Sequence, residues 1–240
     1  MNPEFAQNNP IITGDNALQQ HQPELRQDIC PLCGYAPVSD YDRDSFRCYL
    51  QCKECCLVFV PQQFHLSPGD EREVYDLHHN CPDDLGYRQF LSRLADPLLE
   101  RLAPKSYGLD FGCGPEPTLS VILTEQGHQM SVYDPYYAPN QQALADHYDF
   151  ITSTEVVEHL AAPGQELSRL WALLRPGGWL GIMTKLVIDQ SAFRSWHYKN
   201  DPTHISFFSV QTFEYLAQRW ETRAELFGKD VILMNKPPEN

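Results

Sequence analysis

The chain has 240 residues, of which 42% are hydrophobic and 12% aromatic, a composition typical of a globular protein with one sizeable core. Its formal charge of −14 repels the negatively charged phosphate backbones of nucleic acids, so we expect neither broad nucleic-acid binding nor a DNA partner. No stretch approaches the roughly 18 apolar residues that a membrane span needs. Residues 1–27 are polar and lack a signal-peptide pattern, which predicts a disordered lead-in and a cytoplasmic protein.

Six of the eight cysteines fall between residues 30 and 56. Four of them form two C-x-x-C pairs, and each such turn directs two sulfurs toward one point, as a tetrahedral zinc ion requires. We therefore predict a zinc-ribbon-like module over residues 28–62, with structural Zn²⁺ held by Cys30, Cys33, Cys52 and Cys55. Unrelated reduced thiols are the alternative interpretation.

Residues 63–86 are expected to form a linker that could act as a lid over a binding site. Beyond it, helical and strand periodicities alternate, which predicts an α/β domain over residues 87–240, a Rossmann-like open sheet with helices on both faces. Residues 175–178 are expected to form a turn. The expected helices cover residues 87–102, 118–126, 163–174 and 210–220, and the expected strands 107–111, 129–133, 148–153, 179–184, 225–227 and 231–234.

A glycine turn follows the first expected strand of this domain. Gly112 and Gly114 form a Gly-x-Gly pattern directly after Asp110, and Asp134 ends the next strand. This arrangement is typical of folds that hold a nucleotide-like cofactor. Pro117 stands where a dinucleotide motif has its third glycine, and no phosphate-binding loop motif is present, so NAD and nucleotide triphosphates are disfavoured.

Four elements in sequence order resemble the class I methyltransferases that use S-adenosylmethionine. The resemblance covers residues 107–184 and implies that Asp110 contacts the cofactor ammonium directly or through water, and that Asp134 accepts both ribose hydroxyls. It further implies that Gly112 and Gly114 allow close backbone approach, and that Glu155 and the Glu158-His159 pair follow the strand whose end faces the transfer site. A helix N-terminal acid and a packed histidine are the alternative for these three residues. Ordinary loop-capping carboxylates are the alternative for Asp110 and Asp134. The four elements are Leu109-Asp110-Phe111-Gly112-Cys113-Gly114, Tyr133-Asp134-Pro135, Tyr148-Asp149-Phe150-Ile151 with Glu155-Val156-Val157-Glu158-His159-Leu160, and Leu174-Arg175-Pro176-Gly177-Gly178-Trp179.

One departure from that family lies between the second and third expected strands. Residues 135–147 are too few for the helix, the further strand and the adenine-contacting acidic loop that the family usually places there. Adenine contacts are therefore not carried over. Tyr136 or Tyr137 could stack on the adenine or lie at its edge, and ordinary surface aromatics are the competing interpretation.

The loop of residues 195–205 mixes aromatic, amide, acidic and imidazole groups, as binding loops at strand ends often do. We interpret His204 as a candidate general base, Asp201 as its orienting partner, and Glu155 as a further catalytic candidate. A purely structural role is the alternative for His204. The chain also resembles bacterial methyltransferases that combine an N-terminal cysteine-rich module with this Asp-Pro-Thr-His loop.

These features predict a methyltransferase that uses S-adenosylmethionine and carries zinc. The acidic surface favours a small-molecule or protein acceptor, and the acceptor itself stays unidentified. An RNA methyltransferase that grips RNA through its zinc module is the first alternative. A non-catalytic zinc-bearing scaffold is the second.

Overall fold

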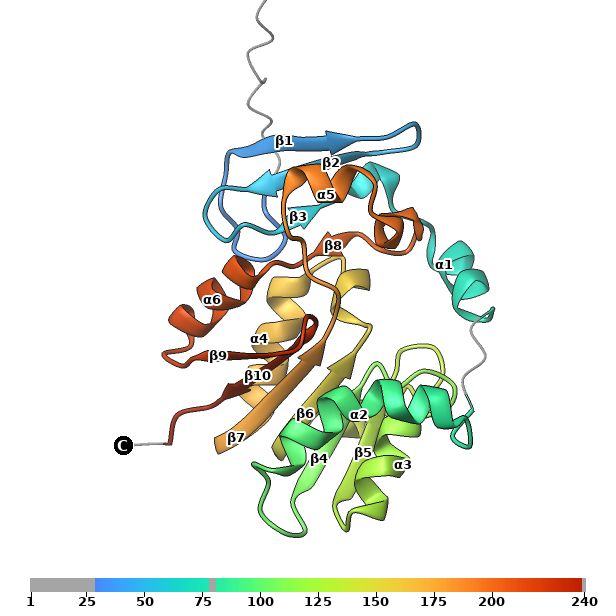
Figure 1. Ribbon diagram of the computed structural model, residues 1–240, viewed down its shortest axis with the longest axis vertical. Coiled ribbons are helices and arrows are strands. Elements are labelled where there is room, and N and C mark those ends of the chain that lie inside the picture. The colour runs from blue at the N-terminus through green and yellow to red at the C-terminus, as the bar shows by residue number, and fades with distance from the viewer. Residues whose placement is uncertain (1–28, 78–80, 239–240) are drawn as a thin grey trace, which may run out of the picture.

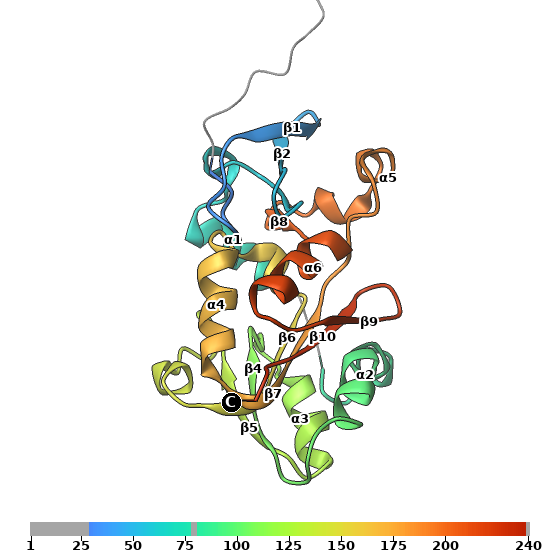
Figure 2. The same cartoon turned by 90° about the vertical axis from the view of Figure 1, so that its left-hand side faces the viewer.

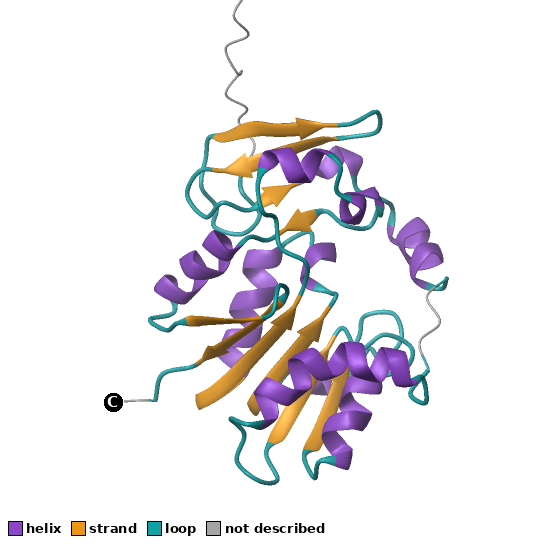
Figure 3. Ribbon diagram, viewed as in Figure 1, coloured by secondary structure: helices purple, strands orange, loops and turns teal. Residues whose placement is uncertain are grey.

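The computed structural model describes residues 29–77 and 81–238, and the expected lead-in, residues 1–27, lies outside them. Two sheets dominate the described part (Figures 1 and 3). The larger has six strands in the order β5-β4-β6-β7-β10-β9, and the smaller has four in the order β1-β2-β3-β8. The expected α/β fold is confirmed.

The larger sheet has a parallel half and an antiparallel half. Its first four strands are parallel because each is joined to the next through a helix or helical turn, whereas β10 returns antiparallel to both β7 and β9. The expected C-terminal hairpin is therefore confirmed. The strands are β4 (Tyr107–Phe111), β5 (Gln129–Tyr133), β6 (Tyr148–Thr154), β7 (Leu174–Met183), β9 (Ala224–Phe227) and β10 (Val231–Asn235).

Helices cover both faces of this sheet, as Figure 2 shows from the side. Helices α2 (Leu85–Leu99) and α3 (Thr118–Glu125) bury their apolar residues in one core on the first face. Helices α4 (Pro163–Leu173) and α6 (Val210–Arg219) contribute to a second core on the opposite face. Pro97 lies inside α2, two residues before its last residue, and the helix continues through it.

The smaller sheet joins the two ends of the chain. Strands β1 (Val38–Arg43), β2 (Cys48–Cys52) and β3 (Val58–Phe59) form an antiparallel meander. Strand β8 (Ser206–Phe207) pairs with β3, although it comes about 150 residues later in the sequence. Two short helices flank this sheet, α1 (Pro68–Tyr75) and α5 (Gln190–Arg194). The cysteine-rich segment and the loop before β8 are thus parts of one structure.

Two connections of the larger sheet differ in outcome. Between β5 and β6 the chain forms only the 3-10 helix η2 (Gln141–Leu144), as the short sequence there led us to expect. Residues 175–178, where we expected a turn, lie at the start of β7, where the strand register shifts and Gly177 has a φ of 79°. Gly177 N–H donates to Lys236 O at 2.9 Å and Lys236 N–H to Gly178 O at 2.8 Å, so the C-terminal segment pairs with this irregular part of the strand.

Within the described residues, every helix is too short or too polar to cross a lipid bilayer.

Candidate functional site

A cavity of about 890 Å³ lies at the carboxyl ends of β4, β5 and β6. Its floor is formed by the residues that directly follow these strands, namely Gly112–Pro115, Asp134–Tyr137 and Thr154–Val156. Helix α1 lies over it from one side, and the loop of residues 201–205 closes it from the other. Ligands of open α/β sheets bind at this end of the strands, where adjacent connections diverge.

The glycine turn at the end of β4 needs its two glycines for different reasons. Both have positive φ, 76° at Gly112 and 65° at Gly114, a region that suits glycine. A Cβ on Gly112 would lie 2.4 Å from a methyl carbon of Val156, whereas a Cβ on Gly114 would meet no atom within 4 Å. Gly114 lines the cavity, so its missing side chain leaves open space where a ligand can approach the backbone.

Asp134 joins the glycine turn to the turn after β5. One carboxylate oxygen accepts from the Gly114 N–H at 3.1 Å, and the other accepts from the Tyr136 and Tyr137 N–H groups at 2.8 and 3.0 Å. The residue is 7% exposed and lines the cavity. Since each carboxylate oxygen has two lone pairs, these bonds leave acceptor capacity for a ligand.

Asp110 lies beneath the cavity and does not line it. Its carboxylate is 4% exposed and accepts hydrogen bonds from Ser120 Oγ at 3.1 Å and Thr152 Oγ1 at 2.9 Å. Burial raises the pKa of Asp110 to about 6. In this structure the side chain therefore connects β4 with α3 and β6, and its contact with a ligand ammonium stays a prediction.

Glu155 and Glu158 place two carboxylates around the hydroxyl of Tyr198. That hydroxyl lies 3.3 Å from Glu155 Oε2 and also donates to Glu158 Oε1, whose second oxygen accepts from Thr184 Oγ1 at 3.0 Å. Burial and the nearby Glu158 raise the pKa of Glu155 to about 8, and burial raises the pKa of Glu158 to about 7. Glu155 also has a φ of 52°, a strained conformation for a non-glycine residue and one that clusters at functional sites.

His204 and His159 stand side by side next to Glu158, with ring centroids 4.7 Å apart. Nδ1 of His204 donates to Tyr198 O at 2.7 Å. Burial and the neighbouring His159 lower the pKa of His204 to about 4, so its ring is neutral at pH 7. Asp201 Oδ2 lies 3.8 Å from His204 Nε2, which is near but beyond hydrogen-bond distance.

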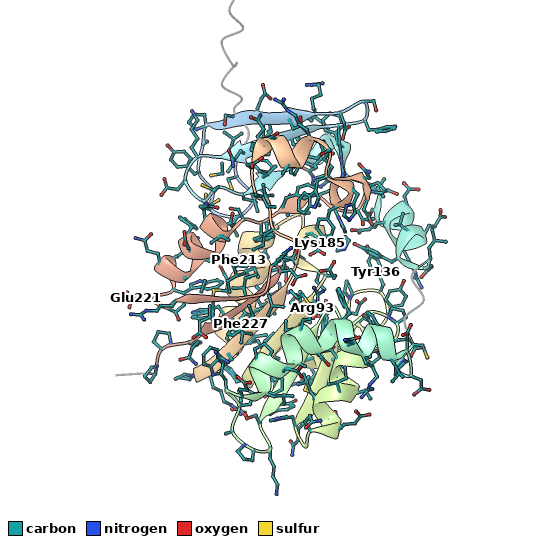
Figure 4. All side chains as sticks on the ribbon, viewed as in Figure 1. Arg93, Tyr136, Lys185, Phe213, Glu221 and Phe227 are labelled. Carbon is teal, nitrogen blue, oxygen red and sulfur yellow. The ribbon has the colours of Figure 1, made fainter. Side chains whose placement is uncertain are left out.

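Helix α1 is held over the cavity by tyrosine hydroxyls. Tyr136 donates to Glu71 Oε2 at 2.7 Å and Tyr137 to Asp76 Oδ1 at 2.6 Å. Tyr75 packs edge-on against the His159 ring with centroids 5.2 Å apart. Figure 4 shows Tyr136 below α1, facing the interior of the molecule. The segment expected to act as a linker and lid thus carries a helix that roofs the site.

The four cysteines of the two C-x-x-C turns converge outside the cavity, next to the start of α4. The Sγ–Sγ distance is 3.5 Å both for Cys30 with Cys55 and for Cys33 with Cys52. Two thiolates on one zinc ion lie about 3.8 Å apart, given a Zn–S bond of about 2.3 Å and tetrahedral geometry. All four ligand atoms lie within 4.8 Å of one another. The donor set and its spacing fit a tetrahedral metal.

The fold brings most of the sequence-predicted site residues to one cavity. Gly112, Gly114, Asp134 and Glu155 line it together with Asp201 and His204, whereas Asp110 lies below it. Sequence reasoning missed the roles of Glu71 and Tyr75 in α1 and the contacts of Tyr198 with Glu155 and Glu158. The aromatic and acidic character of residues 71–76 was the available signal.

Residues 85–220 match the family described as "Methyltransferase domain", which is more than half of the chain. The chain belongs to this family. The expectation of a class I, S-adenosylmethionine-dependent methyltransferase is confirmed.

Comparison with solved structures finds methyltransferases at low sequence identity. One of them is the 1,6-didemethyltoxoflavin-N1-methyltransferase of Burkholderia thailandensis, solved with 1,6-didemethyltoxoflavin and S-adenosylhomocysteine, which shares the fold. It is 16% identical with a TM-score of 0.53, and the match covers 82% of this chain and 99% of the Burkholderia chain. The magnesium protoporphyrin IX methyltransferase of Synechocystis, solved with SAH, is 14% identical with a TM-score of 0.47. The match covers 72% of this chain and 95% of the Synechocystis chain. A comparison with curated proteins gave no match.

Proposed function

We propose that this methyltransferase transfers the methyl group of S-adenosylmethionine to a small molecule bound inside the cavity. The observation that carries the proposal is one partly open cavity that is lined both by a glycine turn with Asp134 and by Glu155, His159 and His204. Its volume of about 890 Å³ is near the upper end of the range for small-molecule sites, about 300–1,000 Å³, which suits a cofactor together with a compact acceptor. The roof formed by α1 disfavours a polymer as acceptor.

The residues around the glycine turn fit the cofactor. When bound, S-adenosylmethionine supplies an electrophilic methyl group on a sulfonium. Gly114 offers backbone at a point where a side chain would fill the cavity, and Asp134 offers carboxylate lone pairs at the end of the neighbouring strand. Asp110 would support this turn from below, through Ser120 and Thr152, so its contribution to binding is to position the turn.

The acceptor would lie against the wall formed by Glu155, Asp201 and His204. Methyl transfer is an in-line displacement, so this wall must align the acceptor with the methyl group and exclude water. The Nδ1 atom of His204 is committed to Tyr198 O, which leaves the Nε2 lone pair for the acceptor side. Asp201 Oδ2 lies 3.8 Å from the same Nε2 atom, and Asp201 and Glu155 supply further polar groups that line the cavity.

The four-cysteine cluster is proposed to hold structural Zn²⁺. Four thiolates complete a tetrahedral shell and leave no open position for catalysis. Strands β1–β3 are short, and a metal would supply stability that so small a sheet cannot obtain from apolar burial alone.

Calorimetry with S-adenosylhomocysteine tests the cofactor site. We expect the wild-type chain to bind it. Gly114→Ala adds a side chain in the cavity and Asp134→Ala removes a carboxylate, so each variant should bind at least about tenfold more weakly, a loss of about 1.4 kcal/mol. Glu125→Gln, which alters only an exposed ion pair with Arg88, is the matched control and should bind normally. Circular dichroism of each variant verifies the fold. A wild-type chain that binds no S-adenosylhomocysteine would contradict the proposal.

The acceptor class is tested separately with radiolabelled S-adenosylmethionine and fractionated cell extract. Label in the small-molecule fraction, dependent on Asp134, is the expected result. Label confined to RNA or to protein would overturn the choice of acceptor and leave the cofactor site unaffected.

A further inference from the structure

Hydrogen-bond acceptors, which are also the lone-pair donors that ligate metals, converge beside the proposed methyl-transfer position. One carboxylate oxygen of Glu158 and one ring nitrogen each of His159 and His204 lie within 4.8 Å of one another. Glu155 and Asp201 add two further carboxylates around this group, which we call the His159–His204 cluster. The aromatic rings of Tyr75 and Tyr198 pack against its two imidazoles. So many acceptors in a largely buried place call for a positive charge among them.

The histidine tautomers point to a cation as well. Nδ1 of His204 contacts the main-chain oxygen of Tyr198 at 2.7 Å, and Nδ1 of His159 contacts that of Thr203 at 3.2 Å. A carbonyl oxygen only accepts, so both Nδ1 atoms carry the hydrogen and both Nε2 atoms carry the lone pair. Histidines that bind metal are oriented in this manner, by donating the other ring N–H to a carbonyl or carboxylate.

The carboxylates support the same conclusion. Tyr198 has one hydroxyl hydrogen and lies within hydrogen-bond distance of both Glu155 and Glu158. The Oε1 atom of Glu155 is buried, lacks a hydrogen-bond partner among the described residues, and belongs to a residue with strained φ. A buried carboxylate oxygen without a donor is costly unless a cation or ordered water approaches it.

We propose that Glu158, His159 and His204 bind one divalent transition-metal cation, with Glu155 at its side. Nitrogen ligands from imidazole together with a carboxylate suit Mn²⁺, Fe²⁺, Co²⁺ or Zn²⁺, whereas Mg²⁺ and Ca²⁺ prefer oxygen alone. Atoms bound to one ion through bonds of about 2.0–2.2 Å lie at most about 4.4 Å apart, so small side-chain rotations bring the three ligand atoms to coordination distance. Two histidines and one carboxylate leave positions open toward the cavity.

The open positions define the acceptor, and this step rests on the proposed function. A cation at the cavity wall binds hydroxyl or carbonyl oxygens, so the acceptor would be a small molecule whose methylated group is a hydroxyl, with a neighbouring oxygen as second ligand. Coordination lowers the pKa of that hydroxyl, whose proton leaves to solvent. The oxygen lone pair forms the new C–O bond while the C–S electron pair stays on sulfur, giving a neutral thioether.

Electron paramagnetic resonance with Mn²⁺ tests the site on the full chain, with zinc retained in the four-cysteine cluster. Mn²⁺ prefers nitrogen and oxygen ligands to thiolates, so it reports on the His159–His204 cluster. We expect one Mn²⁺ per chain, and at least about tenfold weaker binding in His159→Ala and in His204→Ala. His197→Ala is the matched control, because this imidazole lies outside the cluster near Lys185. Circular dichroism of every variant verifies that the fold is retained, and binding of S-adenosylhomocysteine is measured alongside.

The outcomes separate the two proposals. A wild-type chain that binds S-adenosylhomocysteine but not Mn²⁺ would overturn the metal site and leave the proposed function in place. Mn²⁺ binding that persists unchanged in both cluster variants would also overturn the site, because the ion would then be held elsewhere. Stoichiometric Mn²⁺ binding lost in the variants supports the site, whether or not the cofactor binds. Should a variant fail to fold, His159→Gln replaces it, since the amide keeps a similar size and polarity.

Discussion

Among individual residues, the most consequential side chain outside the cavity is Asp110. It is a fully enclosed carboxyl group whose neighbours are two hydroxyls, Ser120 Oγ and Thr152 Oγ1. Hydroxyls can donate to a carboxylate or accept from a protonated carboxyl, so either form is accommodated. Burial favours the neutral form, which is why its pKa lies at about 6, above its ordinary 3.8.

We predict that Asp110 makes the protein without cofactor less stable as the pH rises. A carboxyl group with a raised pKa in the folded state contributes stability below its unfolded pKa, and this contribution is lost as the pH rises from about 4 through about 6. The loss has an upper limit of about 3 kcal/mol at 1.36 kcal/mol per pKa unit. Urea unfolding at pH 4.5 and pH 8 should therefore show Asp110→Asn gaining stability over wild type only at the higher pH. A stability difference that stays constant across the pH range, or one shared by the exposed control Asp83→Asn, would contradict this.

The sequence was sufficient to predict that the glycine turn and Asp134 share one edge of the sheet, and insufficient to predict the contacts of Tyr198. Gly112, Gly114 and Asp134 follow strands whose periodicity is local, so their position at one common edge follows from the sequence alone. The bridging of Glu155 and Glu158 by Tyr198 depends on a contact across about 40 residues of chain, which no local pattern encodes.

Among the helices and strands, α1 is attached to the site mainly through side chains. None of its own residues is fully buried, and its helix begins with a Ser67 cap and a proline at the first turn. Its link to the floor of the cavity runs through the Tyr136 and Tyr137 hydroxyls to Glu71 and Asp76. A helix held by few polar contacts opens more readily than one packed into a core, so α1 is suited to admit and enclose ligands.

Removing both hydroxyls should loosen α1 without affecting the sheet. Each Tyr→Phe change removes one hydrogen bond worth about 1 kcal/mol, so the double variant Tyr136→Phe, Tyr137→Phe should increase amide exchange in residues 68–75 by about one to two orders of magnitude. Tyr35→Phe, at an exposed ring elsewhere, is the control. Equal exchange protection in the double variant and wild type would show that other contacts hold the helix.

The strands differ in how far local sequence predicts them. Strands β4, β5 and β6 alternate with helices, and their apolar runs identify them. Strand β8 has two residues and exists because Phe207 and Ser206 pair with β3, a partner that the sequence alone does not reveal. The strand β7 extends into Arg175–Gly178 for a related reason, since the C-terminal segment supplies its hydrogen bonds.

At the scale of the whole molecule, strand pairing connects the cysteine module to the proposed acceptor wall. Pairing of β3 with β8 places the module next to the loop that carries Asp201 and His204. The module also abuts α4, where the Gly164 N–H donates to Pro31 O at 3.2 Å and a Cβ on Gly164 would lie 2.1 Å from Leu32 O. Disturbance of the module should therefore reach the acceptor wall.

Metal removal from the four-cysteine cluster should destabilise both regions. Treatment with a strong chelator, or the change Cys52→Ser, is expected to lower the midpoint of thermal unfolding by several degrees and to increase amide exchange at Ser206 and Phe207, because the thiolates would lose the ion that holds them together. Cys81→Ser, at an exposed cysteine outside the cluster, should leave both quantities unchanged. An unaltered melting midpoint after verified zinc loss would contradict the structural role.

The short pairing of β3 with β8 affects how the protein can be truncated. A fragment cut to the family-matched residues 85–220 would keep β8 but discard its only neighbour in the small sheet. It would also uncover the buried faces of Phe207 and Phe208. Such an unpaired, apolar strand edge invites pairing between copies, so the fragment should aggregate.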